Sequence, residues 1–218
     1  NWGSQFSLLD YPNDRNSWPV TGDTTNAIYM PTSNSITIPA GFIQEPLYST
    51  QQTPSQNYGG IGTVIGHEIT HAFDTTGAFY DETGNYNFWW TERDLYEYDR
   101  RLNLMVNQFD GLEFGGYRVN GENTLSENVS DSGGINCAME VVKSLPNGNL
   151  EEFFTNWAKS FRGKYSNSAI PAIMEGVHSP DKIRVNMQLK NLNEFHELFG
   201  IQETDGMWLA PERRIVIW

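Results

Sequence analysis

The stretch GGIGTVIGHEITHAFD, residues 59–74, decides the fold. Its apolar residues recur at steps of three and four, the spacing of one buried helix face, and residues 67–71 form the pattern HExxH. Four helical residues advance about 6 Å and turn about 400 degrees, so His67 and His71 project from one face and can bind one metal ion. Glu68 lies beside that face, where a carboxylate can take a proton from a metal-bound water. This stretch predicts a buried helix that carries a metal site.

A catalytic zinc site needs a third protein ligand and an open position for water. Cys137, the single cysteine of the chain, is one candidate. Glu127 and Asp131 are a second, because residues four apart on a helix face the same way. One of these acids could bind the metal while the other orients a ligand imidazole. An ordinary acidic helix face would show the same spacing, so the residues alone leave the third ligand open.

Composition excludes several classes of protein. The chain has 218 residues, 38% of them hydrophobic and 13% aromatic, which is enough for a buried core and excludes a disordered chain. Fourteen Lys and Arg against 27 Asp and Glu give a net charge of -13, so we expect no nucleic-acid partner. No stretch approaches the roughly 20 apolar residues of a membrane helix, and the N-terminal residues lack the features of a signal peptide.

The pattern along the chain predicts a mostly helical α+β domain with a small N-terminal sheet. We interpret residues 1–20 as a connection from an upstream region and residues 21–218 as one domain. TNAIYM (25–30) and SITIPAGF (35–42) are β-prone and separated by four turn-forming residues, which indicates a hairpin. Helices are expected at about 61–73, from TERD (91–94) to Phe109, at about 122–145 and over 150–161.

Two glycines, Gly133 and Gly134, lie in the middle of the helix expected at 122–145. Each costs roughly 1 kcal/mol relative to alanine there. Close packing against another backbone would explain them. His196, within NEFHELF, is expected on the solvent-facing side of a helix.

GGIGTVIGHEITHAFD and ENVSDSGG together resemble the neprilysin and endothelin-converting-enzyme family of zinc metallopeptidases. Residues 25–47, TNAIYMPTSNSITIPAGFIQEPL, are similar to that family's NAxY strand and the segment after it. Residues 177–199, VHSPDKIRVNMQLKNLNEFHELF, resemble its HSPxxxR segment and the helix that follows. The resemblance runs from about residue 16 to Trp218 and implies a thermolysin-like zincin catalytic domain.

The resemblance implies a role for each residue of the metal site. His67, His71 and Glu127 would bind one zinc ion per chain. Glu68 would be the general base, and the water held by the zinc would attack the peptide carbonyl. Asp131 would accept a hydrogen bond from His67 and fix its tautomer.

The resemblance also implies substrate contacts. His178 would stabilise the oxyanion of the reaction, and Arg184 would bind a substrate backbone carbonyl. Asn26 and Ala27 would form hydrogen bonds with an extended peptide. The hydrophobic pocket would be formed by Phe42, Leu47, Val64 and Trp157.

The function implied by the resemblance is a zinc-dependent endopeptidase that cleaves peptides on the amino side of hydrophobic residues. Its partners would be peptide substrates and, if the native chain is longer, the family's N-terminal lid domain, which is absent from these 218 residues. The expected location is extracellular or membrane-anchored and facing outside.

Two alternatives depend on particular residues. Family members usually have Asp two residues before the histidine of HSP, where this chain has Gly176, which favours a catalytically weakened zinc-containing peptide-binding module or an inactive fragment. The other alternative is a closed structural zinc site with Cys137 as its fourth ligand.

Overall fold

The computed structural model describes residues 18–218. The connection predicted for residues 1–20 therefore lies outside the described residues, apart from its last three positions. The described part is mostly helical and contains two small antiparallel sheets, as the sequence predicts. No helix in it combines the length and the apolar character that crossing a membrane requires.

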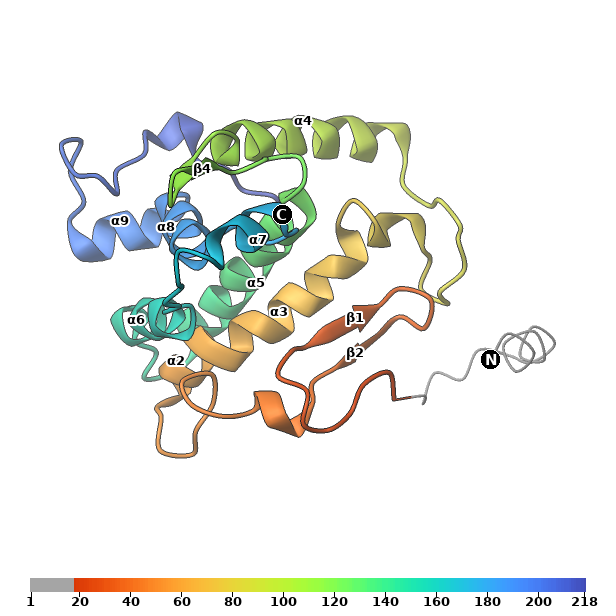
Figure 1. Ribbon diagram of the computed structural model, residues 1–218, viewed down its shortest axis with the longest axis horizontal. Helices are drawn as coiled ribbons and strands as arrows, with labels where there is room; N and C mark the ends of the chain where they lie inside the picture. Colours follow the sequence, from red (N-terminus) through yellow and green to blue (C-terminus); the bar gives the residue numbers. More distant parts are fainter. Residues whose placement is uncertain (1–17) are drawn as a thin grey trace.

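The helices follow one another along the chain, joined by turns, loops and a small hairpin (Figure 1). Their bounds are α2 (Pro54–Asn57), α3 (Thr63–Thr70), α4 (Glu92–Phe109), α5 (Leu125–Ser144), α6 (Leu150–Ser160), α7 (Ile170–Glu175), α8 (Asp181–Lys190) and α9 (Asn193–Phe199). A π-helical turn, η2 (Tyr58–Gly62), leads into α3, and the 3-10 turn η3 (His71–Phe73) follows it. Three further 3-10 turns are η1 (Ala40–Phe42), η4 (Gly77–Phe79) and η5 (Pro211–Arg213). The helix predicted at 61–73 thus corresponds to α3 and its two flanking turns.

A hairpin of two strands, β1 (Ile28–Met30) and β2 (Ser35–Thr37), forms the predicted N-terminal sheet. Ile28 pairs with Thr37, and the turn between the strands contains Asn34 at a positive φ of 44°. In Figure 1 the hairpin lies along α3, and β1 is the strand next to that helix. Among the described residues β1 pairs only with β2, so its other edge stays open. A second, shorter hairpin joins β3 (Glu113–Phe114) to β4 (Tyr117–Arg118).

Helix α4 begins at the predicted cap. The Thr91 hydroxyl accepts from the backbone N–H of Asp94, and the Asp94 side chain accepts in return from the backbone N–H of Thr91. This reciprocal capping box satisfies two backbone donors that a helix start otherwise leaves unpaired. The helix buries Tyr98, Leu102, Met105 and Phe109 on one face.

Helices α3 and α5 pack closely because glycines meet at their crossing. A Cβ on Gly134 would lie 2.5 Å from the carbonyl oxygen of Thr63, and one on Gly66 would lie 2.9 Å from Cα of Gly134. A Cβ on Gly133 would lie 2.2 Å from the hydroxyl of Thr70. The glycines predicted to interrupt α5 therefore permit the close approach of two backbones, at the point where α3 carries HExxH.

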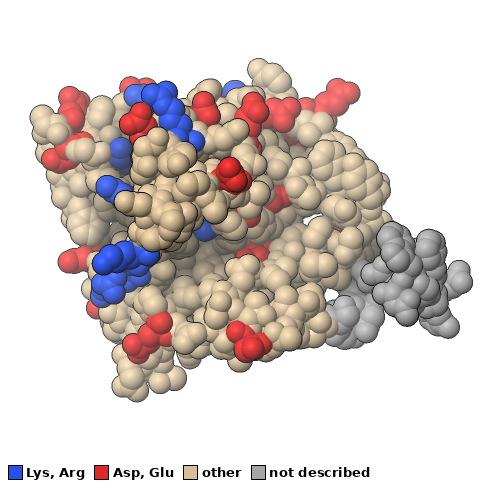
Figure 2. Space-filling view, viewed as in Figure 1, with Lys and Arg blue, Asp and Glu red and all other residues tan. Residues whose placement is uncertain are grey.

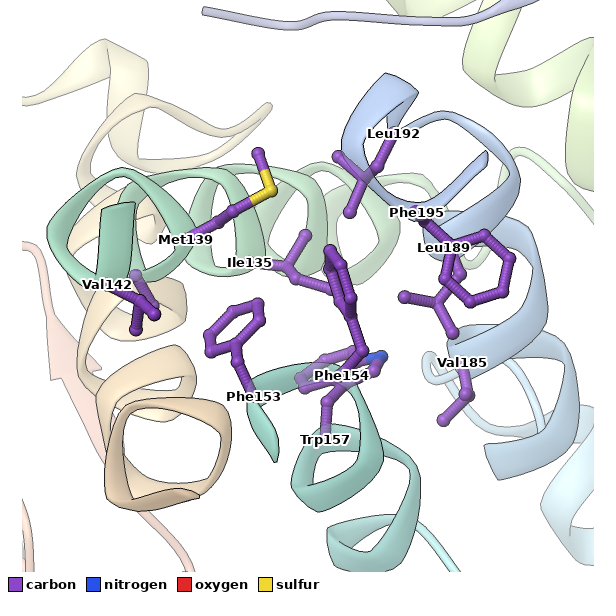
Figure 3. Close-up of a cluster of buried hydrophobic side chains, with 11 residues drawn as sticks. Ile135, Met139, Val142, Phe153, Phe154, Trp157, Val185, Leu189, Leu192 and Phe195 are labelled. Atoms are coloured by element: carbon purple, nitrogen blue, oxygen red, sulfur yellow. The ribbon is translucent and has the colours of Figure 1, made fainter. Parts of the chain in front are cut away.

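The main core lies between α5, α6, α8 and α9 (Figure 3). Its buried members include Ile135, Phe153, Phe154, Trp157 and Leu189. A second cluster joins α4 and α5 to α8 and to the C-terminal residues Ile215 and Ile217. Together these clusters fix α5 from several sides, so its functional face is held rigidly.

The prediction that His196 faces solvent is wrong. The residue is buried, and its Nε2 lies 3.0 Å from the backbone carbonyl oxygen of Lys190 in the last turn of α8. A helix end leaves its last carbonyl groups without intrahelical partners, and an imidazole N–H can satisfy one of them. His196 therefore links α9 to the end of α8.

Candidate metal centre and surrounding cleft

Three ligand groups meet on one face of α3. His67 and His71 stand one turn apart, with 3.0 Å between their Nε2 atoms. Glu127, from the first turn of α5, places Oε2 3.2 Å from Nε2 of His67 and 3.8 Å from Nε2 of His71. Within the described part of the chain, these three residues form the cluster of His, Cys, Asp and Glu side chains able to hold a metal ion.

The far nitrogen of each imidazole is held by a carboxylate. Nδ1 of His67 lies 2.8 Å from Oδ1 of Asp131, and Nδ1 of His71 lies 2.7 Å from Oδ2 of Asp74. An ionised carboxylate only accepts hydrogen bonds, so both Nδ1 atoms carry the proton and donate it. In their neutral forms both rings then present Nε2 lone pairs toward each other, and two lone pairs cannot share a hydrogen bond.

The donor set fits zinc. Two nitrogens bound tetrahedrally to one zinc at about 2.0 to 2.1 Å stand roughly 3.3 Å apart, close to the separations found here. Oε2 of Glu127 is buried and makes no hydrogen bond of acceptable geometry, although imidazole nitrogens surround it. Two facing lone pairs and an unpaired carboxylate oxygen need a cation between them.

Electrostatics around the ligands favour metal binding. Burial alone would raise the pKa of Glu127, but the imidazoles of His178 and His67 hold it well below its ordinary value. Burial would lower the pKa of His67, yet the carboxylates of Asp131 and Glu127 raise it to about 9, so a metal ion must displace a proton from Nε2 when it binds. An imidazole made basic in this way is also a stronger metal ligand.

Asp74 is a site residue that the sequence analysis missed. Its Oδ1 accepts from the backbone N–H groups of Thr76 and Gly77, both at 2.7 Å. Its Oδ2 accepts from His71 and from the hydroxyl of Ser126. Burial raises the pKa of Asp74, but these donors bring it below its ordinary value, so the carboxylate is ionised. The signal available in the sequence was its position three residues after His71.

Asp131 supports the site from α5. It is 1% exposed, and Arg184 on α8 donates to it through Nε and Nη2, each at 2.7 Å. Burial alone would raise the pKa of Asp131, but the guanidinium of Arg184 and then His67 lower it to about 2. Arg184 also lies over the ring of Phe161, 4.7 Å from its centroid. The two residues link α8, α6 and α5 at the metal centre.

Glu68 follows His67 on α3 and is 6% exposed. Burial raises its pKa, an effect that the imidazoles of His67 and His71 partly offset. A carboxylate with a raised pKa is better suited to accepting and returning a proton near neutral pH. The structure places this carboxylate in the wall of the same cavity as the ligand cluster.

His178 lies in the loop after α7, half-exposed, with Nε2 2.9 Å from Oε2 of Glu127. The loop is anchored to α5 and to the turn before it. Ser179 donates to Oδ1 of Asn128 at 3.0 Å, and Asn123 donates to the carbonyl oxygen of Gly176 at 2.8 Å. These bonds hold the segment that contains Gly176, the position where the family resemblance implies an acid.

A cavity of about 370 Å³ opens onto these groups. Figure 2 shows the hollowed surface over α3, between the β1/β2 hairpin and the α7 segment. Besides the metal-site residues, the walls include Asn26, Ala27, Tyr29, Phe42, Val64, Trp157, Phe161, His178 and Arg184. The structure therefore brings most of the predicted substrate contacts to one cleft, and adds Tyr29 and Phe161.

Leu47 is the exception among the predicted contacts, because it does not line the cavity. Its backbone lies against η2, where its carbonyl oxygen accepts from the N–H of Ile61 at 2.8 Å. A Cβ on Gly60 would lie 2.2 Å from that same oxygen. The backbone of Leu47 therefore supports the start of α3, and a contact of its side chain with a substrate stays a prediction.

Cys137 does not reach the ligand cluster either. It is exposed on α5 and lines a separate groove behind α3, together with Ile69 and Phe73. The hypothesis of a closed site with Cys137 as fourth ligand is wrong for this arrangement. The position in front of the three ligands instead faces the cleft.

The chain is similar to known proteins in sequence and in fold. The profile of Peptidase family M13 matches residues 26–215. A neutral endopeptidase of Lactobacillus helveticus is 43% identical over 211 residues, which are 96% of this chain and 32% of that protein. The crystal structure of PepO from Lactobacillus rhamnosis superposes with a TM-score of 0.90 at 40% identity, over 94% of this chain and 33% of the other.

The zinc metalloprotease ZMP1 of Mycobacterium tuberculosis, solved in complex with an inhibitor, also has a TM-score of 0.90. It is 34% identical, over 98% of this chain and 35% of the other. The chain thus spans about a third of the length of the relatives it matches.

Proposed function

The chain belongs to peptidase family M13, and from that membership we propose that it is the catalytic part of a zinc-dependent endopeptidase. The observation that carries the proposal is the convergence of two imidazole lone pairs and the unpaired oxygen of Glu127 beside a buried carboxylate, Glu68. His67, His71 and Glu127 would hold one zinc ion per chain. A bound zinc ion supplies Lewis acidity, which lowers the pKa of water and polarises a carbonyl group.

Glu68 moves the proton. Its carboxylate takes a proton from the attacking water, and the same oxygen later returns it to the nitrogen of the leaving amine. One water is consumed and one peptide C–N bond is broken, so Glu68 ends in the state in which it began. The raised pKa of Glu68, caused first by its burial, favours both transfers.

The residues around the cleft position the peptide. The open edge of β1 can add an extended substrate as a further strand, with Asn26 and Ala27 beside it. His178 is placed to donate a hydrogen bond to the substrate oxygen that gains negative charge, and Arg184 to donate to a backbone carbonyl.

The proposed preference is for a hydrophobic residue after the scissile bond. Its side chain would lie against the aromatic and aliphatic part of the cleft, which Phe42, Val64, Trp157 and Phe161 form. The net charge of -13 supports peptide substrates over polyanions. Membership in the family also supports a second, N-terminal domain as the partner that closes the cleft, and a location outside the cell.

The test is the substitution Glu68→Gln, which keeps the size of the side chain and removes its basicity. Cleavage of a mixed peptide library should fall by a factor on the order of 10² to 10⁴ while the zinc content, measured by elemental analysis, stays unchanged. Glu113→Gln is the control, because in the described part of the chain Glu113 forms an ion pair with Arg118 at an exposed site. Both should be measured on the 218 residues and on the longest polypeptide that the gene encodes.

Two outcomes would overturn parts of this proposal. A Glu68→Gln variant that still cleaves would remove Glu68 from its role. A wild-type protein that binds zinc and peptides but shows no turnover in either form would establish the non-catalytic peptide-binding module instead.

A further inference from the structure

Two serines of α5 lie against the second metal ligand. The hydroxyl of Ser130 lies 3.0 Å from Nδ1 of His71. The hydroxyl of Ser126 donates to Oδ2 of Asp74, the same oxygen that accepts from Nδ1 of His71. Neither hydroxyl takes part in the proposed cleavage reaction.

The two serines alternate with the two acids of the site. Ser126 and Ser130 are four residues apart, and so are Glu127 and Asp131, which places all four on adjacent rows of one helical face. The acids serve the metal position and His67, whereas the serines serve His71 and its acceptor. One stretch of α5 therefore contacts both histidines of HExxH.

The hydroxyl of Ser126 restricts what Asp74 can do. Oδ1 of Asp74 is occupied by two backbone N–H groups, so the orientation of the carboxylate is fixed on that side. Ser126 fixes the other oxygen, because a hydroxyl beside an ionised carboxylate must donate to it. With Oδ2 held in place, Nδ1 of His71 keeps its proton and Nε2 keeps its lone pair for a metal.

Ser130 restricts the ring of His71 itself. It is fully buried, and its oxygen meets the same Nδ1 that Asp74 meets. Rotation of the imidazole away from Asp74 would break both contacts. A ring held by two groups at Nδ1 has one direction left for Nε2, toward Nε2 of His67 at 3.0 Å.

We propose that Ser126 and Ser130 are positioning residues, which set the tautomer and the ring orientation of His71 before a metal ion arrives. The inference rests on the metal centre of the proposed function, and it concerns the affinity of that centre, not the chemistry of cleavage.

The experiment measures zinc affinity by competition with a chromophoric chelator. Ser126→Ala, Ser130→Ala and the double variant should bind zinc more weakly, by about 10-fold for each single change and up to 100-fold for the double change. Ser132→Ala is the matched control, since Ser132 is buried in the same helix but lies about 200 degrees around the helix axis from Ser130. Ser126→Thr keeps the hydroxyl and should restore most of the affinity.

A second measurement does not involve a metal. Nitrogen NMR shifts of His71 in the zinc-free protein report which ring nitrogen carries the proton. The wild type and Ser132→Ala should show protonated Nδ1, and the double variant a mixture of tautomers. Alanine is a good helix former, so thermal unfolding should confirm that each variant is folded.

The outcomes separate the two proposals. If the wild type binds no zinc, the proposed function fails. If the wild type binds zinc and the serine variants bind it with equal affinity and the same His71 tautomer, the positioning role is wrong and the proposed function stands.

Discussion

Replacement of Gly134 by alanine tests whether the close approach of α3 and α5 creates the metal centre. The added Cβ would lie 2.5 Å from the carbonyl oxygen of Thr63, which is 0.9 Å inside the 3.4 Å at which ordinary contact begins. It would also lie 2.7 Å from the backbone nitrogen of His67. Both neighbours are backbone atoms of a helix, so they cannot yield by a change of rotamer, and the two helices must separate.

Two opposing contributions set the change in the free energy of unfolding. Overpacking costs about 1 to 3 kcal/mol, whereas exchanging glycine for alanine within a helix gains about 1 kcal/mol. Because the backbone cannot relax here, we expect Gly134→Ala to lower the free energy of unfolding by about 2 kcal/mol. Metal ligands tolerate shifts of about 0.2 Å, so a separation several times larger should weaken zinc binding on the order of 100-fold.

Urea unfolding of the zinc-free protein measures the first effect, and chelator competition measures the second. Gly206→Ala is the control, because nothing lies within 4 Å of the Cβ it would add. If Gly134→Ala matched the wild type in zinc affinity and in unfolding free energy, the tight helix crossing could not be what brings the ligands together.

Two further substitutions test buried polar groups. The pKa of Asp131 is about 2 in the folded chain, against an ordinary value of 3.8. The ionised carboxylate therefore contributes roughly 2 kcal/mol to the free energy of unfolding of the zinc-free chain above about pH 4. This contribution is lost as the pH falls through 2. Asp131→Asn should therefore flatten the acid side of the stability curve measured by unfolding between pH 2 and 6, and an unchanged curve would contradict the assignment. The side-chain amide of Asn156 donates to the carbonyl oxygens of Pro46 and Gln56 at 2.9 and 2.7 Å. Asn156→Ala removes both hydrogen bonds, so it should lower the free energy of unfolding by about 2 to 4 kcal/mol and lower the melting temperature. A melting temperature equal to that of the wild type would refute this prediction.

Most of the long helices could be predicted from the sequence, because each has a local signal. The capping pair at Thr91 and Asp94 marked the start of α4, and the apolar stripe of residues 150–161 marked α6. The strands are shorter than predicted, because the chain turns into η1 at Ala40 instead of continuing β2. A β-prone composition does not show where hydrogen-bonded pairing ends.

The metal-ligand cluster could be predicted because spacing within a helix is a local property. Ser126 and Ser130 could not, since their contacts depend on how closely α3 and α5 approach, whereas Asp74 could have been found from its position three residues after His71. The prediction for His196 was wrong for a related reason. The type of a residue shows that it can be buried, but only the packing of the helices determines which groups it contacts.

The open edge of β1 has a consequence for the chemistry of any bound chain. A polypeptide that joins a sheet edge offers the N–H and C=O of every second residue to its neighbour, and the residues between turn theirs away. If a substrate binds along β1, then a backbone N-methyl group or an ester link would block recognition at alternate positions only. Recognition along the cleft would then depend on the position of each amide group in the substrate backbone and not on the side chains.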